Sequence, residues 1–77
     1  MTLKEEIEQL KKSRRSVRPQ KLHRLLDRAG FTRRAGKGDH WVYTHPRLPR
    51  LLTVDPGNPL LPVYVSKAIR AIEEVIE

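Results

Sequence analysis

Cysteine is absent from this 77-residue chain, which excludes disulfide bonds, a thiolate zinc site and a cysteine nucleophile. Long hydrophobic runs are missing too, because the longest one, residues 60–65, is far too short to span a membrane. The chain becomes charged at Lys4, Glu5 and Glu6, so we expect no secretory signal. These features fit a reducing compartment, and we expect a cytoplasmic protein with no membrane partner.

Several other chemistries lack their residue patterns. No Ser-His-Asp arrangement is evident, and the Gly36-x-Gly38 pair opens a strand, whereas a phosphate-binding glycine loop opens a helix. The spacing of the histidines matches no metal site. A domain of this length buries only about 60% of the surface of its unfolded chain, so its core cannot hold a large cofactor. We therefore expect neither a metal nor a cofactor.

The charges that are present are spread unevenly along the chain. The formal net charge is +7, and the pI is about 10.4. Residues 11–50 carry thirteen Lys or Arg against Asp27 and Asp39, a net of +11, whereas residues 1–10 and 51–77 each sum to −2. A field of this sign attracts polyanions. Nucleic acid is the first partner that we expect, and a solvated basic surface is the alternative.

Apolar periodicity and turn residues predict one α+β domain in two layers. The expected elements are helices over residues 2–13, 19–29 and from 62 onward, and strands over residues 31–35, 40–44 and 51–54. Pro46–Pro49 is expected to be a hairpin loop. The strands form a three-stranded antiparallel sheet, with helices on one face and the other face open. Residues 1–17 then make an N-terminal helix and basic linker, and residues 18–77 make the domain proper.

The N-terminal helix begins with a capping box, Thr2 followed by Glu5. Its narrow apolar stripe consists of Leu3, Ile7 and Leu10. The stripe supports either docking onto its own domain or self-association and partner binding.

The second predicted helix begins at Pro19, which suits the first helical position. Gly30 is expected to end this helix in the left-handed conformation. His23 falls off the apolar stripe of the helix, so we expect it to be solvated.

The stretch 36–46, Gly-Lys-Gly-Asp-His-Trp-Val-Tyr-Thr-His-Pro, carries the clearest chemistry of the chain. Its turn places His40 at the mouth of a hairpin. Imidazole exchanges protons near neutral pH, so His40 is the candidate catalytic residue: it can take the proton of an RNA 2′-hydroxyl or protonate the leaving oxygen. If Tyr43 is buried, His40 lies on the open side of the sheet or at its edge. The alternative is an ordinary surface histidine at the start of a strand.

Basic side chains near this turn are candidates for holding RNA phosphates. They are Arg33, Arg34, Lys37 and Arg47. Gly38 allows close backbone approach to RNA, and Asp39 either adjoins the same site or closes the turn. Trp41 can stack on an unpaired base, although the core is the more common place for a tryptophan.

With these residues in place, the chain resembles the HicA toxin family, also called YcfA-like mRNA interferases. The resemblance runs from Pro19 to Glu77, roughly three quarters of the chain. It is carried by Leu22-His23-Arg24-Leu25-Leu26, Ala29-Gly30-Phe31, Lys37-Gly38-Asp39-His40, Tyr43-Thr44-His45-Pro46 and Ser66–Ile72. The family usually has Ser where this chain has Asp39, and its third strand commonly leads into a segment with Pro and His, whereas residues 55–59 contain no His.

The resemblance implies a fold similar to double-stranded RNA-binding domains (dsRBD-like, α-β-β-β-α), here with an additional N-terminal helix. It also implies a metal-independent endoribonuclease that cuts mRNA, the toxin of a type II toxin–antitoxin system. The family's catalytic histidine corresponds to His40, and the implied partner is a HicB-type antitoxin that masks the site. The alternative is a non-catalytic RNA-binding or protein-interaction module with the same fold. A basic DNA-binding protein is a third interpretation, but no recognition-helix pattern supports it.

Overall fold

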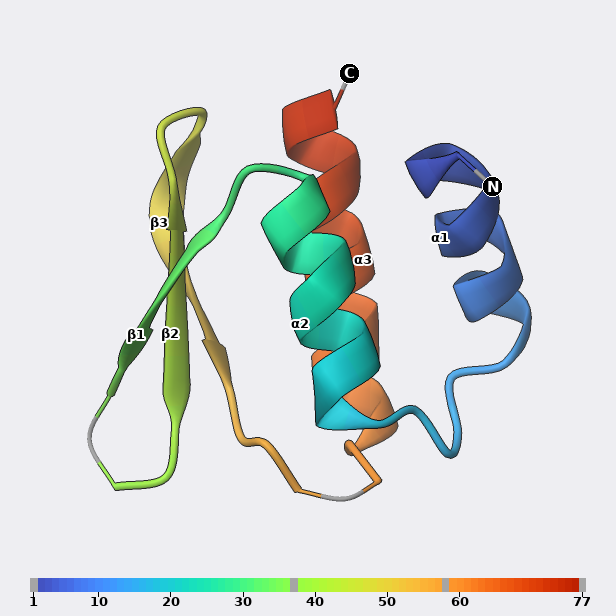
Figure 1. The fold of residues 1–77 in the computed structure, drawn as a ribbon, viewed down its shortest axis with the longest axis horizontal. Coiled ribbons are helices and arrows are strands. Elements are labelled where there is room, and N and C mark those ends of the chain that lie inside the picture. Colours follow the sequence, from blue (N-terminus) through green and yellow to red (C-terminus); the bar gives the residue numbers. More distant parts are fainter. Residues whose placement is uncertain (1, 37, 58, 77) are drawn as a thin grey trace.

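Three helices and three strands make up the α+β fold that the sequence predicts. The computed structural model describes residues 2–36, 38–57 and 59–76. The elements in chain order are α1 (Leu3–Lys12), α2 (Pro19–Arg28), β1 (Thr32–Ala35), β2 (Trp41–His45), β3 (Leu48–Val54) and α3 (Pro62–Ile76). In Figure 1 the three helices stand on the same side of the sheet, so the layer arrangement is the expected one.

The sheet is antiparallel, with β2 between β1 and β3. Tyr43 pairs with Leu52, and both side chains are buried. Because strand side chains alternate, this face packs on the helices, while the face that carries Val42 and Thr53 points away from them. The helices therefore cover one face of the sheet and leave the other open, as predicted.

Helix α1 packs within the domain. The predicted capping box of Thr2 and Glu5 is present. Ile7 and Leu10 are buried in the same core as the rest of the chain, and Leu3 packs against that core. Ion pairs at the rim of the helix join Lys11 to Glu73 in α3 and Glu6 to Arg28 in α2. The apolar stripe is thus used inside the domain, and in this fold it is not exposed for self-association.

The segment between α1 and α2 is attached to the rest of the domain through Val17 and Arg14. Val17 is buried, and its carbonyl accepts a hydrogen bond of 2.8 Å from the Leu60 N–H. The segment lies against the loop before α3, and Arg14 donates a 2.8 Å hydrogen bond to the Ser66 hydroxyl in α3 itself. Residues 1–17 and 18–77 therefore share one core.

Helix α2 ends as predicted. Pro19 occupies its first turn, and Gly30 has a φ of +96°, in the left-handed region. The Phe31 N–H donates to the Leu26 carbonyl at 3.0 Å, and the Gly30 N–H donates to the Asp27 carbonyl at 3.0 Å. This pair of bonds is a Schellman motif, which satisfies the last carbonyls of the helix.

The predicted bounds of the second hairpin are wrong. A hairpin turn lies at the predicted place, but it consists only of Pro46 and Arg47, because β3 begins at Leu48 and not at Leu51. Pro49 is tolerated inside β3 because β3 is an edge strand and the β2–β3 register shifts between Tyr43 and His45. The smaller differences are at strand ends: β1 begins at Thr32, and β2 spans Trp41–His45, so His40 precedes it.

Candidate active site

His40 lies at the end of the hairpin turn that joins β1 to β2. Its carbonyl accepts a 2.8 Å hydrogen bond from the Gly36 N–H, which closes the turn. Gly36 is required there, because a Cβ would lie 2.7 Å from Cγ2 of Val42. Tyr43 is buried and the His40 side chain is exposed, so the histidine lies at the edge of the open face, as the alternation predicted.

Two shallow hollows meet at His40. The first, of about 630 Å³, lies on the open face and is lined by Gly38, Asp39, His40, Val42, Thr53 and Asp55. The second, of about 530 Å³, is lined by Ala35, Gly38, Asp39, His40, Trp41, Asp55, Pro56 and Gly57. An extended anion that crosses from one hollow to the other passes the imidazole.

Asp55 also lines this site, although the sequence analysis did not select it. Val54 pairs with Trp41 across the β2–β3 ladder. His40 directly precedes Trp41, and Asp55 directly follows Val54. Because the strands are antiparallel, His40 and Asp55 lie at the same end of the sheet, and both line the two hollows. The pairing register of β2 with β3 could have identified Asp55. That register could not be predicted, because the predicted start of the third strand was wrong.

The arginines of β1 point to opposite faces of the sheet. Arg34 pairs with Val42 and so lies on the open face, on the same side as the first hollow. Arg33 pairs with Tyr43 and lies on the helix side. Gly38 has a φ of +68°, and a Cβ there would meet nothing within 4 Å, so its backbone is accessible to a ligand. Lys37 lies outside the described residues.

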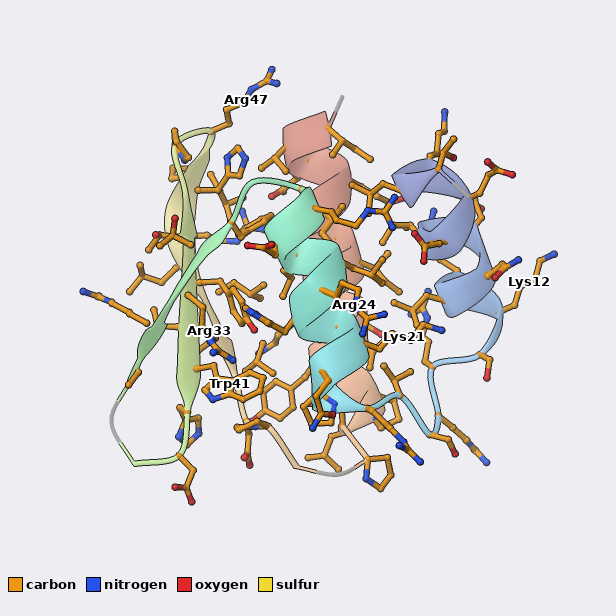
Figure 2. All side chains as sticks on the ribbon, in the orientation of Figure 1. Lys12, Lys21, Arg24, Arg33, Trp41 and Arg47 are labelled. Atoms are coloured by element: carbon orange, nitrogen blue, oxygen red, sulfur yellow. The ribbon has the colours of Figure 1, made fainter. Side chains whose placement is uncertain are left out.

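Trp41 lies on the helix side of β2 and is half-buried. The Arg33 guanidinium lies over the Trp41 ring at 4.5 Å from its centroid, a cation–π contact. The His23 ring approaches Trp41 edge-on at 6.0 Å. Figure 2 shows Arg33 and Trp41 side by side near the lower end of the sheet. A base that stacks on this side of the indole would have to displace Arg33.

The Tyr43 hydroxyl lies in a small polar cluster between sheet and helix. It lies 3.0 Å from Nδ1 of His23 and accepts a hydrogen bond from Arg33. Burial raises the pKa of Tyr43 to about 12, and the charge and hydrogen bond of Arg33 oppose that rise. His23 is half-buried by these contacts, so the prediction that it is solvated is wrong.

His45 is a structural histidine. The Arg47 N–H donates to Nδ1 of His45 at 3.0 Å, so this nitrogen carries no proton. Nε2 then donates to the Ala29 carbonyl at 3.1 Å. Both ring nitrogens are occupied by backbone groups, and these bonds fix the turn after β2 to the end of α2.

Arg47 is not brought to His40. Its guanidinium donates to the Val75 carbonyl at 3.2 Å, near the end of α3. Figure 2 shows Arg47 at the opposite end of the sheet from Trp41. The five residues of β2 separate the two ends, a span of about 17 Å. Of the predicted phosphate-holding arginines, only Arg33 and Arg34 lie on the strand next to the site.

Within residues 2–36, 38–57 and 59–76, no group of three or more His, Cys, Asp or Glu side chains is placed to hold a metal ion. No helix formed by these residues is both long and apolar enough to cross a membrane. Comparison of the chain with protein-family models, curated proteins and solved structures finds no match.

Proposed function

We propose that this protein is a metal-independent endoribonuclease that cuts mRNA, with His40 as its general acid or base. The observation that carries the proposal is the position of His40, exposed at the end of an open sheet face and shared by two hollows. The chain as a whole is basic, with a formal net charge of +7, and Arg33 and Arg34 lie on the strand next to the site. An RNA backbone can therefore approach the imidazole along the open face.

The chemistry that this geometry supports is cleavage assisted by the neighbouring 2′-hydroxyl. His40 takes the proton of that hydroxyl, the 2′-oxygen attacks phosphorus to form a 2′,3′-cyclic phosphate, and the bond to the 5′-oxygen breaks as that oxygen takes a proton from water. Such proton transfer contributes about 10²–10⁴-fold to the rate. Arg34, on the same face, stabilises the charge on the phosphate oxygens. A DNA strand lacks the attacking hydroxyl and should not be cut.

The biological role that we propose is the toxin of a type II toxin–antitoxin pair. The sequence resemblance to the HicA family supports it, and so does the order α2, β1, β2, β3, α3, which fits a dsRBD-like arrangement with α1 added in front. The cognate partner would be a HicB-type antitoxin that covers the His40 end of the sheet. Such a partner would have to bury the two hollows to stop cleavage.

Incubation of labelled mRNA with purified protein in EDTA tests the proposal. We expect the wild type to cut and His40→Gln to retain RNA binding without cutting. His23→Gln is the matched control, because it also removes one imidazole but keeps a side chain that can hydrogen-bond to the Tyr43 hydroxyl. Equal cleavage by the His40 variant and the wild type would remove His40 from the mechanism.

The two carboxylates at the site favour a second candidate, a non-catalytic RNA-binding or protein-interaction module. Asp39 and Asp55 line both hollows with His40 and place negative charge where a phosphate would lie. This candidate predicts RNA binding that weakens steeply with salt and does not depend on His40. Binding without cleavage by the wild type, unchanged in His40→Gln, would favour it over the nuclease.

A further inference from the structure

A second basic surface lies along the outer edge of β3, where α3 passes the sheet. A groove of about 380 Å³ runs there, with Leu48, Leu52 and Ala71 among its lining residues. Three cations line the same groove: Arg50 from β3, and Lys67 and Arg70 from α3. Leu51 also lines it and is 56% exposed, an apolar side chain available to a ligand.

The groove stays positively charged after the ion pair between Arg50 and Glu74 is counted. Arg50 is held by Glu74 at 2.8 Å. Lys67 and Arg70 are exposed and stand one helical turn apart, so they lie on one face of α3. The groove therefore combines two exposed cations with an apolar floor, which suits an anionic chain that also carries apolar groups.

The groove is joined to the His40 site through Thr53. This residue lines both the β3–α3 groove and the open-face hollow that contains His40. The other basic hollow, lined by residues of α2 such as Lys21 and Arg24, shares no lining residue with the hollows at His40. The β3–α3 groove is therefore the basic hollow that borders the open-face hollow at His40.

The edge of β3 is poorly suited to pairing with an added peptide strand. Pro49 has no N–H, and the register of β3 against β2 is interrupted beside it. Recognition in this groove must therefore come from side chains. Lys67 and Arg70 can bind a phosphate backbone through their charge, and this binding needs no strand pairing.

We infer that the β3–α3 groove binds the stretch of single-stranded RNA that flanks the phosphate at His40. This inference rests on the proposed nuclease function and names the substrate path of the same site. From Arg50 to Asp55 the strand spans roughly 17 Å. At the 3.4 Å spacing of a stacked strand this corresponds to about five nucleotides on one side of the cut.

The test compares two double variants that lose the same charge. Lys67→Gln with Arg70→Gln alters the groove, and Lys21→Gln with Arg24→Gln alters the exposed face of α2 with the same residue types and spacing. Both lower the net charge from +7 to +5, and Gln is a good helix former. Binding is measured on a labelled RNA oligonucleotide over a salt series, and cleavage kinetics on the same RNA.

We expect the groove variant to lower the salt slope of RNA binding by about 1.4, because two phosphate contacts are lost and each contributes ~0.7 on single-stranded RNA. We also expect it to raise the KM for RNA. The α2 variant should leave both close to wild type. On an RNA shortened by about five nucleotides on the groove side, the groove variant and the wild type should bind with the same affinity.

Two results would overturn the inference. Equal losses in the two variants would show that net charge alone matters. Unchanged RNA affinity, together with polyglutamate binding that only the groove variant loses, would assign the groove to an acidic protein segment.

The nuclease proposal fails separately. Groove-dependent binding with no cleavage by the wild type would support the RNA path and refute the nuclease. Cleavage with an unchanged KM in the groove variant would refute the path and leave the nuclease standing.

Discussion

The buried hydroxyl of Tyr43 should make the stability of this protein fall at alkaline pH. The pKa of Tyr43 rises from an ordinary value of 10.0 to about 12, mainly because the ring is buried. Between these values the unfolded chain loses the tyrosine proton while the folded protein keeps it. The stabilisation is therefore complete below about pH 10 and is lost as the pH rises through 12.

The size of the effect follows from the pKa difference. A difference of about two corresponds to about 2.7 kcal/mol, at 1.36 kcal/mol for each pKa unit. At pH 8 we expect Tyr43→Phe to be less stable than the wild type by about 1 kcal/mol, because a hydrogen bond to His23 is lost. Near pH 12 the order should reverse, because phenylalanine has no proton to lose.

The assay is urea unfolding followed by far-UV circular dichroism at several pH values between 8 and 12. The quantity of interest is the difference in unfolding free energy between the wild type and Tyr43→Phe, because other titrating groups cancel in it. Tyr64→Phe in α3 makes the same chemical change at a half-buried position and is the control. A wild-type minus Tyr43→Phe difference that stays constant from pH 8 to 12 would refute the reasoning.

Three further predictions concern packing and charge. Ile7→Ala should cost about 2–5 kcal/mol in urea unfolding, because α1 docks through this buried side chain; a change near zero would show that α1 is not docked. Gly36→Ala should destabilise more than Gly57→Ala, since its Cβ would meet Val42 at 2.7 Å, whereas the nearest atom at Gly57 is 3.5 Å away; equal melting temperatures would contradict this. Asp39→Ser should tighten RNA binding at low salt by removing a negative charge from both hollows, and weaker binding would argue that Asp39 orders the turn.

The helices could be predicted from the sequence because their signals are local. Capping at Thr2, Pro19 at a first turn and Gly30 at a helix end each act within a few residues. Strand alternation linked His40 to the open side of the sheet if Tyr43 was buried, and the structure has Tyr43 buried and His40 exposed. Whether α1 docks on the domain was left open, because its stripe fits either outcome until α3 is placed beside it.

The parts that failed depend on contacts between distant segments. The start of β3 was missed because Pro49 reads as a loop residue unless the strand is known to lie at an edge. That error also hid Asp55, whose position opposite His40 depends on the strand register. The grouping of Lys67 and Arg70 with Arg50 was missed for another reason: residues 51–77 are net negative as a segment, and only the fold brings these cations to one groove.

The docking of α1 has a consequence for protein synthesis. The main packing partner of α1 is α3. The Val17 carbonyl, just after α1, accepts its hydrogen bond from the N–H of Leu60, which is synthesised much later. A ten-residue helix is marginal alone in water, so α1 lacks its main packing partner until α3 has been synthesised. The sheet and α2 can begin to associate earlier, but the core closes only when α1 and α3 are both present. Folding of this domain is therefore tied to completion of α3, and a nascent chain that stops before it would expose Ile7 and Leu10 to its surroundings.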